Sequence, residues 1–156
     1  MAAKILRQAG AYYGQSLSRR AVLTVPSSDW KKLTKLPTFT NTDCVVLDLE
    51  DGVAESAKQI ARENISRYLP ESASTLNREI CVRINSVSSK YINDDVQLLK
   101  DLSTTIDCLF VPKVDSIDEV KWLADQLGVN RQYNLVVYCE SARSLADLRS
   151  ILTSAS

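Results

Sequence analysis

The chain has 156 residues, of which 45% are hydrophobic and 24% charged, a composition typical of one globular domain with a core. Basic and acidic residues each number 19, so the net charge is zero and predicts binding to neither nucleic acid nor an anionic membrane. The absence of histidine excludes Ser-His-Asp and Cys-His catalysis and histidine-ligated zinc. We therefore expect acid–base chemistry from carboxylates, lysine, tyrosine or water, and any metal to be a hard, oxygen-ligated cation such as Mg²⁺.

The N-terminal segment is basic and contains no acidic residue before Asp29. If residues 1–14 (MAAKILRQAGAYYG) form a helix, apolar side chains share one face and Lys4 lies near Arg7 on another. Basic, acid-free, amphipathic segments are typical of mitochondrial presequences, and a merely disordered N-terminus is the alternative. We predict a presequence over residues 1–18, a folded domain over residues 19–156 and a mitochondrial location.

Apolar runs rich in valine, isoleucine and leucine recur along the rest of the chain, mostly without polar alternation. They lie at residues 21–25, 44–49, 80–84, 107–112 and 134–139. Runs of this kind are typical of strands that are buried on both faces. None approaches the roughly 18 residues that a membrane-spanning helix needs.

Helical patterns separate and follow the five strands. They cover residues 29–36, 54–69, 93–102, 116–128 and 141–152. The second helix is predicted to bury one stripe, made of Ala57, Ile60, Ala61, Ile65 and Leu69. Pro70 is expected to end that helix. Ser116 and Glu119 predict a capping box at the start of the fourth helix, and Gly128 predicts its end.

Alternating strands and helices predict a parallel sheet covered by helices. Two architectures contain five such βα units. One is a five-stranded doubly wound sheet, which 156 residues would complete. The other is a partial TIM (β/α)₈ barrel, the first five units of eight, since a whole barrel needs about 250 residues. In both, ligands bind at the carboxyl ends of the strands.

Charged residues stand at the carboxyl ends of four of the five predicted strands. They are Asp48, Glu50, Asp51, Arg83, Lys113 and Glu140. Each alone has a plain structural reading, as a turn residue, a partner for an opposite charge or a surface side chain. Together they suit Mg²⁺ and an anionic substrate, because arginine binds a carboxylate through paired hydrogen bonds.

The four cysteines are dispersed, and none forms a C-x-x-C pair. They are Cys44, Cys81, Cys108 and Cys139. Each lies in or beside a predicted strand, so we expect buried free thiols in a reducing compartment. A metal or redox site is the alternative.

Several segments resemble the citrate lyase β-subunit-like group of the HpcH/HpaI aldolase superfamily in order and spacing. They are RRAVLTVP, DCVVLDLEDGVAESAK, VRINSVSS, VPKVDSIDEVKWLAD and CESA. The resemblance implies a TIM barrel, a trimer and a Mg²⁺-dependent lyase that cleaves a carbon–carbon bond beside a CoA thioester. Citramalyl-CoA would give acetyl-CoA and the keto acid pyruvate.

The resemblance also implies roles for particular residues. Glu140 in CESA matches a magnesium ligand, and Arg83 in VRIN matches a substrate contact. Lys31 matches a lysine that contacts CoA or substrate. Thr24 replaces a family tyrosine, and Ser27 a family glycine, in what we expect to be the substrate-contacting loop after the first strand.

The acids of LDLED border the metal site in the family. Glu50 and Asp51 would hold metal-bound water or orient Arg83, and Lys113 would lie beside them. The family's second magnesium ligand follows strand six, and its catalytic aspartate lies near the C-terminus. Neither has a counterpart here, so no catalytic residue is assigned and we expect the 156-residue chain alone to be inactive.

Two other hypotheses stay open. The first is a non-catalytic CoA- or acyl-CoA-binding or regulatory short form. The second is a receiver-like signalling domain with an acidic pocket. A receiver would carry its phosphoacceptor aspartate at the end of the third strand, where this chain has Arg83 and Asn85 instead.

Overall fold

The computed structural model describes residues 19–72, 76, 78–102, 106–128 and 133–153, and the predicted presequence lies outside them. Five parallel strands form one sheet, and their order in the sheet is their order in the chain. The strands are β1 (Val22–Pro26), β2 (Cys44–Asp48), β3 (Glu79–Arg83), β4 (Cys108–Val111) and β5 (Asn134–Val137). A doubly wound sheet reverses its strand order at a switch point. This sheet does not, and it stays open between β1 and β5, so the predicted partial TIM barrel is confirmed.

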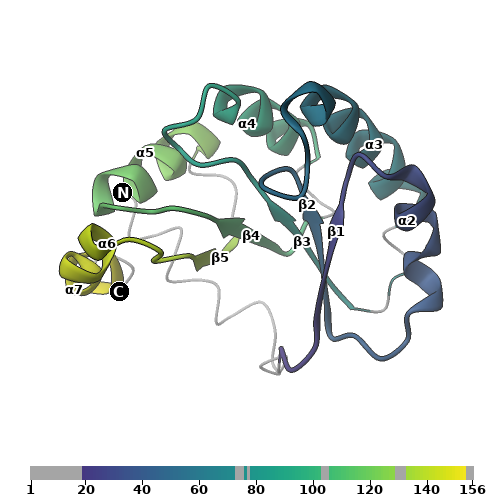
Figure 1. Ribbon diagram of the computed structural model, residues 1–156, viewed down its shortest axis with the longest axis horizontal. Coiled ribbons are helices and arrows are strands. Elements are labelled where there is room, and N and C mark those ends of the chain that lie inside the picture. The colour runs from purple at the N-terminus through teal and green to yellow at the C-terminus, as the bar shows by residue number, and fades with distance from the viewer. Residues whose placement is uncertain (1–18, 73–75, 77, 103–105, 129–132, 154–156) are drawn as a thin grey trace.

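Helices cover the outer face of the curved sheet (Figure 1). They are α2 (Trp30–Lys35), α3 (Lys58–Ser72), α4 (Ile92–Asp101) and α5 (Ile117–Leu127), with short 3-10 turns η1 (Leu36–Thr38) and η2 (Glu55–Ala57) beside α2 and α3. Two short helices, α6 (Ala142–Ala146) and α7 (Leu148–Thr153), follow β5. No helix in the described part of the chain is long and apolar enough to cross a membrane.

The core has one layer on each face of the sheet. Between sheet and helices, strand residues such as Val45, Leu47 and Leu109 share a buried cluster with Leu33 and Ile65 of the helices. A smaller cluster covers the inner face and consists of Cys44, Val46, Cys81, Cys108 and Phe110. Alternate residues of each strand face the two layers, which explains the continuous apolar runs in the sequence.

Two predictions about α3 are wrong. Pro70 lies inside the helix, which continues to Ser72. Proline's fixed φ suits a helix, and its missing N–H removes one main-chain hydrogen bond two residues before the helix ends. Ile60 is 46% exposed, whereas Lys58 and Arg62 lie on the buried stripe because both have polar partners inside.

The capping prediction for α5 is confirmed, and the prediction for the last helix is wrong. Ser116 and Glu119 form both bonds of a capping box, and Gly128 ends α5 with a φ of 82°. The single helix expected over residues 141–152 is divided into α6 and α7. Asp147 separates them because its ψ of 3° turns the chain out of the α-helical path.

Candidate functional site

Asp48 ends β2 and is 1% exposed. Its Oδ1 accepts hydrogen bonds from Arg83 Nε at 2.7 Å and from the main-chain N–H of Glu50 at 2.8 Å. Its Oδ2 accepts from Arg83 Nη2 at 2.7 Å and from the N–H of Gly52 at 2.9 Å. Asp48 is therefore committed to orienting Arg83 and the following turn, and it is unsuited to ligate a metal.

Gly52 is required by this carboxylate. A Cβ at position 52 would lie closer than 3.0 Å to Asp48 Oδ2, a separation that Cβ atoms essentially never show. The glycine in LEDG therefore reflects close approach of the main chain to a buried acid, not a positive φ.

Glu50 and Asp51 are held by basic groups from neighbouring strands. Glu50 is 4% exposed, and its carboxylate lies 3.2 Å from Arg83 Nη1 and 2.5 Å from Lys113 Nζ. The exposed Asp51 carboxylate lies 3.0 Å from the same Nζ. These hydrogen bonds raise the pKa of Lys113 and lower the pKa of Asp51. Asp48 raises the pKa of Arg83 in the same way.

Lys113 has an unusual main-chain conformation. Its φ is 53°, in the left-handed region that a residue with a Cβ seldom adopts. Among the described residues other than glycine, Lys113 alone has a positive φ. The conformation places the ammonium against Glu50 and Asp51. Such strain tends to accumulate at functional sites, which supports the interpretation of this edge as one.

Glu140 follows β5 and is exposed. Within the described residues, no ion pair engages its carboxylate. Burial is the main cause that raises the pKa of Tyr138, the residue that directly follows β5. Because all five strands are parallel, Glu140 after β5 and Arg83 at the end of β3 stand at the same edge of the sheet. We call Asp48, Glu50, Asp51, Arg83, Lys113 and Glu140 the strand-end rim.

Lys58 was missed by the sequence analysis. It opens α3, is 7% exposed, and its Nζ donates to the main-chain carbonyls of Leu49 and Glu50 at 2.6 and 2.7 Å. Burial lowers the pKa of Lys58 despite nearby acids. This ammonium supports the main chain that carries Glu50. The sequence could have indicated its burial, because Lys58 has helical spacing from Ala61 and Ile65 on the buried stripe.

A buried polar network supports the next loop of the site. Asp95 of α4 is 0% exposed and accepts from the main-chain N–H and the side-chain amide of Asn85 at 2.8 and 2.7 Å. Arg62 of α3 donates to its other oxygen at 3.0 Å. Burial nevertheless raises the pKa of Asp95. The network fixes the chain that follows Arg83.

For two predicted substrate positions, the described structure records no side-chain contact with the rim. Lys31 is exposed on α2, and among the described residues no ion pair joins it to the rim. Thr24 lies within β1, not in the loop expected there, since the strand continues to Pro26. Ser27 does follow the strand. It is fully buried, and its Oγ has no hydrogen-bond partner within the described part of the chain.

The rim's donor set fits a hard cation such as Mg²⁺ only in part. Carboxylate oxygens are the ligands that Mg²⁺ prefers, and Glu140 supplies a free one. Glu50 and Asp51 would have to break their ion pairs with Lys113 before either could bind the cation directly. With those ion pairs kept, Glu50 and Asp51 are suited to accept hydrogen bonds from water molecules bound to the cation.

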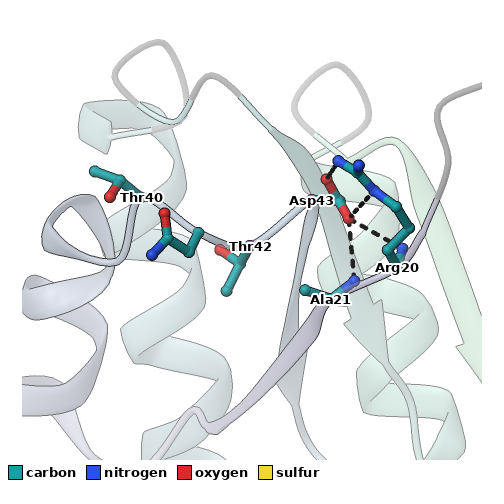
Figure 2. A pocket seen from close by; sticks show the side chains of 6 residues that line it. Arg20, Ala21, Thr40, Thr42 and Asp43 are labelled. Carbon is teal, nitrogen blue, oxygen red and sulfur yellow. Dashed lines mark hydrogen bonds and ion pairs between the residues drawn. The ribbon is translucent and has the colours of Figure 1, made fainter.

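A hollow of about 440 Å³ lies at the opposite end of the sheet. Figure 2 shows Arg20 beside Asp43 there, with Ala21, Thr40 and Thr42 nearby. Asp43 accepts from Arg20 Nη2 at 2.9 Å and from the N–H of Ala21 at 3.0 Å. These bonds join the starts of β1 and β2, away from the strand ends where barrel proteins bind ligands.

Five parallel strands in chain order, with acids and bases at their carboxyl ends, define part of a TIM-barrel protein with a charged rim. Residues 20–156 match the HpcH/HpaI aldolase/citrate lyase family, and the chain belongs to this family.

Two curated relatives carry lyase names. The chain is 38% identical over 142 residues to the mitochondrial citramalyl-CoA lyase of Homo sapiens, a match covering 86% of this chain and 41% of the relative. It is 34% identical over 118 residues to the L-malyl-CoA/beta-methylmalyl-CoA lyase of Rhodobacter capsulatus, covering 70% of this chain and 36% of that one. The chain thus spans about two fifths of the length of these relatives.

A solved structure shares the fold. CitE of Mycobacterium tuberculosis, in complex with magnesium, acetoacetate and coenzyme A, matches with a TM-score of 0.67 and 26% identity. The match covers 88% of this chain and 46% of that one.

Proposed function

We propose that this chain supplies the first five βα units of a Mg²⁺-dependent lyase, which converts citramalyl-CoA to acetyl-CoA and pyruvate. The observation that carries the proposal is the rim, where Arg83 and Glu140 follow the carboxyl ends of parallel strands and Glu140 is in no ion pair among the described residues. Support comes from the 38% identity to a citramalyl-CoA lyase and from the likeness to a CitE complexed with magnesium and coenzyme A.

In this reaction the bond between the carbinol carbon and the carbon beside the thioester breaks. The hydroxyl proton leaves, the oxygen forms the ketone of pyruvate, and the bonding electron pair moves to the thioester carbon, which takes up a proton. Mg²⁺ supplies Lewis-acid polarisation of substrate oxygens when bound. Glu140, the carboxylate of the described rim that is in no ion pair, is assigned to the cation, so we assign no residue to move the protons.

Arg83 is suited to bind the substrate carboxylate. A guanidinium has five N–H groups, and three contacts join it to Asp48 and Glu50. The remaining N–H groups can donate to a carboxylate, while Asp48 fixes the plane of the guanidinium. Glu140 would hold the cation, and Glu50 and Asp51 would bind its water or release Lys113 toward the anionic substrate.

We further propose that the 156-residue chain does not turn over citramalyl-CoA alone. Among the described residues, Asp48, Glu50 and Asp51 are in ion pairs, so the rim offers Glu140 as its one carboxylate without an ion pair, and a single carboxylate binds Mg²⁺ only weakly. A CoA- or acyl-CoA-binding short form is then the alternative function of the chain by itself. Mitochondrial import directed by residues 1–18 and trimer assembly are further proposals, supported by the relative's mitochondrial name and by the family resemblance respectively.

A chimera tests the function. Residues 19–156 would replace the matching segment of the human relative, and pyruvate release from citramalyl-CoA would be measured with and without Mg²⁺. The chimera should be active, and Glu140→Gln and Arg83→Leu should each lower kcat/KM at least about 100-fold, the loss expected for a direct ligand or paired substrate contact. Asp118→Asn, on an exposed face of α5, is the matched control. A folded, active chimera that is indifferent to Glu140→Gln would refute the proposal.

A further inference from the structure

A second group of metal-binding side chains lies on the inner face of the sheet, at the ends where the strands begin. Cys44 opens β2, and Glu79 opens β3 as its register partner. Cys81 lies two residues further along β3 and therefore on the same face. Cys108 opens β4 opposite Cys81. Two adjacent rows of the inner face thus carry three thiols and one carboxylate.

The donor atoms of this group are already close together. The Sγ atoms of Cys44 and Cys81 are 3.2 Å apart, and with a carboxylate oxygen of Glu79 they all lie within 4.8 Å of one another. Two sulfurs bound at about 2.3 Å to a tetrahedral Zn²⁺ are about 3.8 Å apart, so the Cys44 and Cys81 sulfurs need to separate by about half an ångström to share the metal. The three cysteines are 0% exposed and Glu79 is 5% exposed.

Charge and access also suit a divalent cation. Arg19 donates to both oxygens of the Glu79 carboxylate, from Nε to Oε2 at 2.5 Å and from Nη2 to Oε1, and each oxygen keeps a lone pair for a metal, unlike those of Asp48. With Cys108 included, three thiolates, one carboxylate and one guanidinium carry three net negative charges, of which a divalent cation neutralises two. The Arg19 side chain is 35% exposed, so the charged partner of Glu79 reaches solvent. As the outer partner of Glu79, it would also orient that ligand.

We propose that Cys44, Glu79 and Cys81 bind a thiophilic divalent cation such as Zn²⁺, with Cys108 as the fourth donor. Four protein donors without an open position define a structural site, so the metal would join β2, β3 and β4 from inside the sheet. Thiolates select against Mg²⁺, which keeps this site chemically distinct from the strand-end rim at the other end of the strands.

Cobalt titration of the reduced 156-residue chain tests the proposal, because Co²⁺ bound by thiolates gives a charge-transfer band. We expect the band to saturate at one equivalent, to disappear with one equivalent of Zn²⁺ and to persist in excess Mg²⁺. Cys44→Ser and Cys81→Ser should each weaken Co²⁺ binding at least tenfold. Cys139→Ser, outside the group, is the matched control.

Circular dichroism would establish that each variant is folded. If a cysteine variant does not fold, Glu79→Gln gives a conservative substitute, expected to weaken Co²⁺ binding at least tenfold while the thiolate band remains. Two results would overturn the proposal. One is a reduced wild-type chain with no thiolate band at one equivalent. The other is a band that needs Cys139 or is indifferent to both Cys81→Ser and Glu79→Gln.

Discussion

Gly52→Ala should destabilise the chain because of one side chain, Asp48. The new Cβ would overlap Asp48 Oδ2, so the carboxylate must move and its 2.9 Å bond from the residue 52 N–H and its 2.7 Å bond from Arg83 are strained. Overpacking a tight site costs typically 1–3 kcal/mol and a lost hydrogen bond about 1 kcal/mol, so we expect about 2 kcal/mol. Urea unfolding, followed by tryptophan fluorescence, measures the loss.

The double variant with Asp48→Ala isolates the cause. Without the carboxylate, the nearest remaining atom to the new Cβ is Pro26 Cγ at 3.6 Å, an ordinary contact. Gly52→Ala should then cost nothing, or stabilise by a few tenths of a kcal/mol through the unfolded chain. Gly128→Ala is the control, since its φ of 82° predicts a cost of about 1 kcal/mol in both backgrounds. Equal costs of Gly52→Ala in both backgrounds would refute the reasoning.

Three further predictions concern residues outside this contact. Lys58→Met should lower the free energy of unfolding in urea by about 2 kcal/mol, because two buried carbonyls lose their donor. The control, Lys90→Met at an exposed lysine, should change it by under about 0.5 kcal/mol. Equal effects of the two substitutions would contradict the burial of Lys58. Hydrogen bonds from Arg20 and the main chain lower the pKa of Asp43 to about 2, so its stabilising contribution should be complete above pH ~4 and be lost as pH falls toward 2. An NMR titration midpoint near 4 would contradict this. Ellman's reagent should label half-buried Cys139 in the folded chain well before the three buried thiols, and uniform labelling rates would contradict their burial.

The strands were predictable from sequence because burial on both faces leaves continuous apolar runs. Their observed ends differ from prediction by no more than two residues. The architecture was harder, since a doubly wound sheet and a partial barrel share the same βα pattern. Strand order separates them, and order is a long-range property that local spacing does not encode.

The rim was predictable as a location but not as a set of pairs. Strand ends placed Asp48, Arg83 and Lys113 at one edge, and the structure confirms that meeting. Their pairing depends on register, which sets Asp48 opposite Arg83, and among the described residues Glu140 has no ion-pair partner. Lys58 was missed because a lysine in an amphipathic helix ordinarily faces solvent, and its acceptors are main-chain carbonyls that no sequence pattern marks.

The crowding of three acids at the end of β2 makes electrostatic sense once their partners are counted. The four rim carboxylates face Arg83, Lys113 and, beneath the turn, Lys58, which leaves one net negative charge. That charge attracts a divalent cation, and the occupied rim would then carry one net positive charge and attract an anionic substrate. Because Lys113 and Arg83 already neutralise the buried Glu50, the ligand-free rim avoids the cost of an unpaired buried charge. The same basic groups are then in place to exchange a protein carboxylate for a substrate carboxylate.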